Sequence, residues 1–350
     1  MTFSKFIAYI LGIGVLAVVA IFSANYVIDP YSVFGTKFFP EYGQLQERYL
    51  KIEYLKTHPE FNTFLIGGSR IGVIKTEIVD GYLPGAKTYN LTLSQARPID
   101  IEKHVEWLER NIPNLSHVIV QLDWAGEYGP ISPGYALMNE SHPEISGRFK
   151  YGFLFNFLTF ISIEALRVKV GNNNSEVIGS FKYDLGKGYW SHPFLDKKIE
   201  ANCDEYVANE KSFSSDNIHP TKLNSELLAK GLSSIARIKG FLEKRNVKLT
   251  VFLTPINHHQ IDSIDVKDYE RFIRQLVKFT DFYNFMYYSK LTKNDCNYYE
   301  ASHYRPVVGE LIIRSLAEQP NNRGEIYRYV TKASVDTHID FLKANYFLKE

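Results

Sequence analysis

The stretch NTFLIGGSRIG, residues 62–72, decides the fold. A short apolar run closed by two glycines is typical of a buried strand that turns tightly into a helix. Gly67 and Gly68 let the backbone turn there and bring the Ser69 N–H to a helix N-terminus, where it can donate to a developing oxyanion. Taken alone, such a turn is more often only a tight strand-to-helix loop.

Similar runs recur along the chain and predict the fold class. We expect strands at residues 62–66, 87–93, 117–122 and 248–253, and a weaker one at 282–286. Apolar residues at helical spacing predict helices over 100–111, 223–244 and 269–279. Strands that alternate with helices of this length indicate an α/β domain whose mostly parallel sheet is covered on both faces. Ligands bind such sheets beyond the carboxyl ends of the strands.

The N-terminal segment predicts a membrane anchor. No charge occurs from Phe6 to Ile28, and about 20 apolar residues span a bilayer. A cleavable signal peptide is the alternative, but the nearest candidate cleavage site, residues 22–24, has a bulky Phe22 where a small residue is wanted. Lys5 before the segment and Asp29 after it favour a single-pass protein of the inner (cytoplasmic) membrane, with its main domain in the periplasm or extracellular space.

Composition narrows the function classes. The 350-residue chain has a formal net charge of +1 and no block of Lys and Arg, so nucleic acid is not expected as a partner. Cys203 and Cys296 either pair in an oxidising compartment or stay as buried thiols. No spacing of Cys and His indicates a metal site, so neither a metal nor another cofactor is predicted.

Two domains are expected, the anchor at residues 1–28 and one α/β domain at 29–350. The first residues after the anchor predict a helix that lies against the domain. Residues 124–216 lack strands of the same quality, so we interpret them as an insertion after the third strand. This insertion either covers the site or forms a packed helical subdomain without contact to substrate. The tail, residues 321–350, reads as a loop followed by an amphipathic helix.

A second chemically suggestive segment is NYYEASHYRPVVGELIIRSL, residues 297–316. Glu300 and His303 are three residues apart on a turn, so the carboxylate can reach the imidazole, fix its tautomer and stabilise the imidazolium. The alternative is a helix-capping segment with a surface histidine.

Together, a serine after the first strand and an acid-x-x-His before the last helix resemble the SGNH/GDSL hydrolase superfamily. The chain is most similar to its membrane-anchored polysaccharide O-acylation branch, of the D-alanyl-lipoteichoic-acid and alginate O-acetylation type. Those proteins also begin with one transmembrane helix, followed by an Asp-Pro, here Asp29-Pro30, and by a helix with Arg and Lys, here Arg48 and Lys51. The run SHYRPVVG, residues 302–309, is the most specific part. The resemblance implies a three-layer, flavodoxin-like domain.

The same resemblance implies roles for individual residues. Ser69 would be the nucleophile, His303 the general base and Glu300, where most of the superfamily has Asp, the orienting acid. In the oxyanion hole, Gln95 falls at the position of a glycine and Asp123 at that of an asparagine. A carboxylate cannot donate a hydrogen bond unless it is protonated.

Asp123 therefore either orders Arg70 through a charge-assisted bond, or leaves the site catalytically weakened. Asn257, after the fourth strand, is a further candidate for substrate contact.

The remaining histidines give weaker indications. His258 and His259 suggest a metal site, but adjacent residues on an extended segment point in opposite directions, so none is expected. His104 and His219 look like surface residues of a helix and a loop.

The implied activity is that of a membrane-anchored extracytoplasmic serine acyl-ester hydrolase or O-acyltransferase acting on a cell-surface polysaccharide. Its partners would be the glycan or acyl donor and, through the N-terminal helix, the lipid bilayer. The acyl-enzyme would release its acyl group to water or to a sugar hydroxyl. The alternative is a non-catalytic, SGNH-like glycan-binding protein or docking partner of a multispanning membrane acyltransferase.

Overall fold

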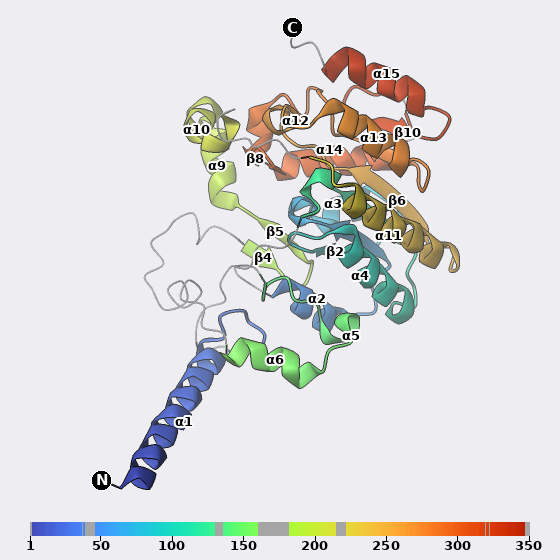
Figure 1. The fold of residues 1–350 in the computed structure, drawn as a ribbon. Helices are drawn as coiled ribbons and strands as arrows, with labels where there is room; N and C mark the ends of the chain where they lie inside the picture. The colour runs from blue at the N-terminus through green and yellow to red at the C-terminus, as the bar shows by residue number, and fades with distance from the viewer. Residues whose placement is uncertain are drawn as a thin grey trace. The chain divides into compact units, whose positions relative to one another are not determined.

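The computed structural model describes residues 2–36, 38, 46–129, 136–159, 182–214, 222–318, 320, 321 and 323–346. The chain divides into two compact units, whose elements Figure 1 labels. Unit 1 comprises residues 1–53 and 131–179, and unit 2 comprises residues 54–130 and 180–350.

In unit 1, the helix α1 (Phe3–Ile28) has the predicted apolar character. Its most apolar 18-residue window has a mean hydropathy of 2.6, and none of that window is buried. By length and composition α1 is either a membrane span or a signal sequence. Its last turns pack against α6 (Lys150–Thr159). There the Asn25 amide donates to the Leu158 carbonyl at 2.6 Å, and the ring of Phe22 meets that of Phe155 edge-on.

The rest of unit 1 is built on aromatic packing. Its small core consists of Val33 and four aromatic residues, Tyr31, Tyr49, Phe153 and Phe157. Its other described helices are α2 (Glu47–Leu55), whose last two residues belong to unit 2, and α5 (Pro143–Ser146). The helix predicted after the anchor is therefore present.

Unit 2 contains a six-stranded sheet with the order β10-β7-β6-β3-β1-β2. Its strands are β1 (Thr63–Gly67), β2 (Thr88–Thr92), β3 (His117–Leu122), β6 (Lys248–Leu253), β7 (Phe282–Asn284) and β10 (Arg328–Val330). The first five pair in parallel, at the predicted places. The edge strand β10, antiparallel to β7, was expected to be loop.

Two groups of helices accompany this sheet (Figure 1). The first group is a row of contacting helices, namely α4 (Pro98–Asn111), α11 (Ser225–Glu243), α13 (Val266–Leu276) and α15 (Val335–Tyr346). In the second group, α3 (Thr76–Tyr82) packs on α14 (Pro306–Ala317). These two helices share a core with Leu65, Ile119 and Phe252 of the sheet. Because every residue of β1, β2 and β3 is buried, both faces are covered.

Short elements surround the carboxyl edge of the sheet. They are the hairpin β4 (Lys182–Asp184) and β5 (Tyr189–Ser191), α9 (Pro193–Ala201), α10 (Cys203–Asn209), α12 (His258–Ile261), the 3₁₀ helix η6 (Asp295–Asn297), and the hairpin β8 (Tyr298–Glu300) and β9 (His303–Tyr304). A disulfide between Cys203 and Cys296 joins α10 to η6, so the two cysteines do pair. The segment interpreted as an insertion, residues 124–216, contributes to both units.

Gly72 provides a test of how tightly unit 2 is packed. A Cβ atom at this position would collide with the indole Nε1 of Trp190. We expect Gly72→Ala to lower the free energy of unfolding by about 1–3 kcal/mol, because the indole must move. Gly81, in α3, has no atom within 4 Å of the corresponding Cβ, so Gly81→Ala should leave stability unchanged or raise it slightly. Urea denaturation of the full chain in detergent measures both, and equal losses in the two variants would contradict the packing described.

Candidate active site

The serine turn lies where the strand order of the sheet reverses, between β1 and β3. Ser69 begins the 3₁₀ helix η1 (Ser69–Val73), directly after Gly68. The Gly68 N–H donates to the side-chain oxygen of Gln121 at 2.9 Å. A Cβ atom on Gly68 would lie 2.8 Å from a carboxylate oxygen of Asp123. The glycine thus lets the end of β3 approach the turn closely.

Ser69, His303 and Glu300 form one hydrogen-bonded chain. The Ser69 hydroxyl Oγ lies 2.6 Å from Nε2 of His303, and Nδ1 of the same imidazole is hydrogen-bonded to Glu300. Glu300 and His303 pair across the β8–β9 hairpin, so the turn that connects these strands sets their separation. The structure therefore brings together a serine hydroxyl, an imidazole and a carboxylate, an arrangement that can activate a hydroxyl for attack.

The electrostatics of Glu300 suit this arrangement. Burial alone would raise its pKa, but hydrogen bonds from His303 and Ser302 outweigh burial and lower the pKa to about 2. The backbone N–H of Ser302 donates to one carboxylate oxygen at 2.8 Å and its hydroxyl to the other at 2.9 Å. Because the carboxylate stays ionised, it favours a proton on Nδ1, which leaves Nε2 free to accept the proton of Ser69.

Arg70 connects the serine turn to the histidine hairpin. Its side chain is 8% exposed, and its Nε donates to the Ser302 carbonyl at 2.7 Å. Nη1 contacts Asp123 at 2.5 Å and Glu127 at 2.8 Å. Burial would lower the pKa of Arg70, but the two carboxylates outweigh it and raise that pKa. Of the two predicted alternatives for Asp123, the ion pair with Arg70 is the contact that is present.

Donors for an oxyanion are only partly defined. The Ser69 backbone N–H has no hydrogen-bond acceptor among the described residues. Gln95, three residues beyond β2, has a φ of 55°, a left-handed conformation that favours glycine. Its role in an oxyanion hole stays a prediction. Asp123 accepts hydrogen bonds from Arg70 and Gln121, so its ionised carboxylate is not a donor.

No sequence pattern indicated that Trp190 contacts the site. The Trp190 indole donates to the Ser69 carbonyl at 3.2 Å, and its ring lies 6.2 Å from that of His303. Residue 190 follows Ser69 by 121 positions, and no local pattern marks the contact. Ser302 lies in the quoted run of residues 302–309, but its hydrogen bonds to Glu300 were not predicted.

Asn257, which was expected to contact substrate, is fully buried. Its side chain caps α12 and donates to Asp295 at 2.8 Å. Its position therefore supports a structural role and not contact with substrate.

The premise that His258 and His259 lie on an extended segment is wrong, because both belong to the helix α12. Their rings are 3.9 Å apart and both face Asp295. The expectation that His104 is exposed is also wrong, because it is buried and its Nδ1 hydrogen-bonds the carbonyl of Asp100. His219 lies outside the described residues.

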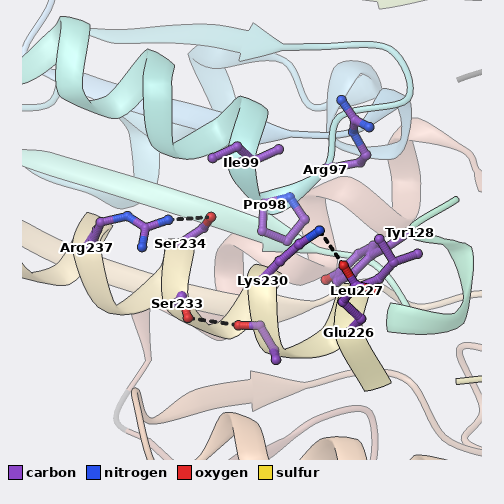
Figure 2. Close-up of a pocket in the computed structure, with 12 residues that line it drawn as sticks. Arg97, Pro98, Ile99, Tyr128, Glu226, Leu227, Lys230, Ser233, Ser234 and Arg237 are labelled. Atoms are coloured by element: carbon purple, nitrogen blue, oxygen red, sulfur yellow. Dashed lines mark hydrogen bonds and ion pairs between the residues drawn. The ribbon is translucent and has the colours of Figure 1, made fainter. Parts of the chain in front are cut away.

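A groove of about 590 Å³ lies between the start of α4 and α11 (Figure 2). Cationic side chains are frequent in its lining, which comprises Arg97, Pro98, Ile99, Tyr128, Glu226, Leu227, Ala229, Lys230, Gly231, Ser233, Ser234 and Arg237. These cations are paired with acids, as in the 2.6 Å contact of Lys230 with Glu226. Ser69, Glu300 and His303 are not among the lining residues, so we do not assign this groove to their chemistry.

The low pKa of Glu300 predicts acid sensitivity. Its folded-state pKa, about 2, lies below the ordinary 4.5. Ionised Glu300 therefore stabilises the fold above about pH 4.5, and this contribution is lost as the pH falls toward 2. We expect Glu300→Gln to flatten the fall in unfolding free energy between pH 5 and 2.5. Glu310→Gln, at an exposed position of α14, should keep the wild-type slope, and equal slopes in all three proteins would contradict the assignment.

Comparison with known proteins does not assign this site. No protein-family model matches the chain, and no curated protein matches its sequence. The interpretation of the site therefore depends on its own geometry.

Proposed function

We propose that this chain is a membrane-anchored, extracytoplasmic serine acyl-ester hydrolase or O-acyltransferase that acts on a cell-surface polysaccharide. One observation carries the proposal, the 2.6 Å contact between the Ser69 hydroxyl and His303 with an ionised Glu300 behind the imidazole. A hydroxyl is a weak nucleophile until an adjacent base removes its proton, and this arrangement supplies that base.

The reaction would proceed in two steps. His303 takes the Ser69 proton while Oγ attacks the ester carbonyl, and the Ser69 N–H donates to the oxyanion. The imidazolium then gives the proton to the departing alkoxide, which leaves an acyl-enzyme. In the second step His303 takes a proton from water or from a sugar hydroxyl, whose oxygen accepts the acyl group. The imidazolium then returns that proton to the departing Ser69 oxygen, which regenerates both side chains. Water gives hydrolysis and the sugar gives acyl transfer.

An SGNH-type fold is part of this proposal. Along the sheet, the parallel strands follow the order second, first, third, fourth, fifth, which is the flavodoxin-like order. Ser69 follows the first strand, and the Glu300–His303 pair precedes α14, as in the superfamily that the sequence resembles. Glu300, Gln95 and Asp123 depart from the usual residues of that superfamily.

An extracytoplasmic location is supported by two features. The end of α1 packs within unit 1 through Asn25 and Phe22, which favours a helix retained as an anchor over one that is cleaved. The disulfide between Cys203 and Cys296 suits an oxidising compartment.

A second candidate function is non-catalytic, namely glycan binding or docking onto a multispanning membrane acyltransferase. Asp123 favours it, because its carboxylate approaches Gly68, next to the nucleophile. A negative charge there opposes a developing oxyanion. The ion pair with Arg70 offsets that charge, and for this reason we favour the enzyme.

A serine-directed fluorophosphonate tests the choice between the two functions. We expect the full chain in detergent to be labelled and Ser69→Ala to lose the label, since only an activated hydroxyl reacts. Ser233→Ala, at an exposed position of α11, should be labelled like the wild type. Folded wild-type protein that stays unlabelled would favour the non-catalytic function.

The proposed location predicts the state of the cysteines. In chain extracted from its native membrane and denatured without reductant, a maleimide should not react, because both thiols are in the disulfide. Reduction should make both thiols reactive. In Cys296→Ser, the Cys203 thiol should react with the maleimide even without reductant. Two reactive thiols in the unreduced wild type would place the domain in a reducing compartment.

A further inference from the structure

Three side chains near the carboxyl edge of the sheet converge on one point. Nε2 of His258 lies 3.3 Å from Oδ1 of Asp295, and Nε2 of His259 lies 3.7 Å from Oδ2. One ligand atom from each residue lies within 4.8 Å of the others. Each side chain is about one-quarter exposed, so the point they surround is reached from solvent.

These separations fit a coordination polyhedron. Zn²⁺ binds imidazole nitrogen at about 2.0–2.1 Å and carboxylate oxygen at about 2.0–2.2 Å. In a tetrahedron with such bonds, neighbouring ligand atoms are roughly 3.3–3.5 Å apart. The contacts of His258 and His259 with Asp295 are close to this value before any adjustment for an ion. Two imidazoles and one carboxylate leave a fourth position for water.

Surrounding contacts hold the ligands in place. The Asn257 amide donates to Oδ1 of Asp295 at 2.8 Å, and the ring of Phe213 lies 6.2 Å from that of His259. The backbone N–H of His258 donates to the Thr292 carbonyl, which fixes the start of α12. Such outer contacts orient the ligands of metal sites and raise their affinity. The two imidazoles, whose ring centroids are 3.9 Å apart, face the same carboxylate.

We propose that His258, His259 and Asp295 bind a divalent transition-metal ion of the zinc class. Two neutral imidazoles suit zinc and similar ions better than Ca²⁺ or Mg²⁺, which prefer oxygen ligands. The ion would fasten α12 to η6. This point lies beside the loop that precedes His303, since the backbone N–H of Asn257 donates to the Ala301 carbonyl. This inference does not depend on Ser69 being a nucleophile.

A zinc titration tests the proposal. The full chain in detergent is first freed of metal with a chelator and then titrated with zinc in competition with a chromophoric chelator. We expect the wild type to bind zinc and to unfold at a higher temperature with it. His259→Ala and Asp295→Asn should each lower the affinity at least about tenfold. Co²⁺ should give the strong visible absorption of a four-coordinate ion in the wild type and lose it in both variants.

Two controls make the outcome unambiguous. Glu144→Gln alters the other grouping of possible ligands, Glu53, His142 and Glu144, and should bind zinc like the wild type. Ser69→Ala should also bind zinc, whatever its effect on labelling. Should Asp295→Asn fail to fold without metal, His259→Gln replaces it, since that side chain is partly exposed. Equal zinc binding by wild type and His259→Ala, or loss of binding in Glu144→Gln alone, would overturn the proposal.

Discussion

The buried guanidinium of Arg70 joins the segments that meet at the carboxyl edge of the sheet. It donates to the Ser302 carbonyl of the histidine hairpin and to the carboxylates of Asp123 and Glu127, which follow β3. Because Arg70 directly follows Ser69, these bonds also fix the position of the serine. Removing one charge from such a buried cluster typically costs about 3–5 kcal/mol, and here it would leave two carboxylates uncompensated beside Ser69.

The charges of the site follow from this network. Asp123 and Glu127 are held by Arg70, and the Gln260 amide donates to Glu127 at 2.9 Å. Glu300 is held by His303 and Ser302. Glu300 is therefore the acid left to act on the imidazole, while Asp123 is part of the scaffold. This division of roles accounts for a serine–histidine contact that forms although the carboxylate of Asp123 lies close to the serine turn.

Elements that depend on a pattern of neighbouring residues could be predicted from the sequence. Apolar runs closed by turn residues located β1, β2, β3 and β6, and helical spacing located α4, α11 and α13. Ser69, Glu300 and His303, which the structure brings into contact, were selected because they belong to two short patterns beside predicted elements. The same patterns could not define the outer strand β10, since three residues are too few for a periodicity.

Other contacts between distant segments were left open or missed, because no local pattern decides them. The Cys203–Cys296 pair and the bond from Trp190 to Ser69 each join residues more than 90 positions apart, and they exist only because of the fold. His258 and His259 were misjudged for a different reason, because one turn of helix after β6 brings together two side chains that an extended segment would separate.

Whether His303 activates Ser69 is tested most directly by the rate at which an activated acetyl ester acetylates Ser69. Mass spectrometry of the peptide that contains Ser69 measures this rate. We expect an adduct on Ser69 that is lost in His303→Ala, as general-base activation of the hydroxyl requires. An absent adduct, or the same rate in His303→Ala, would contradict it.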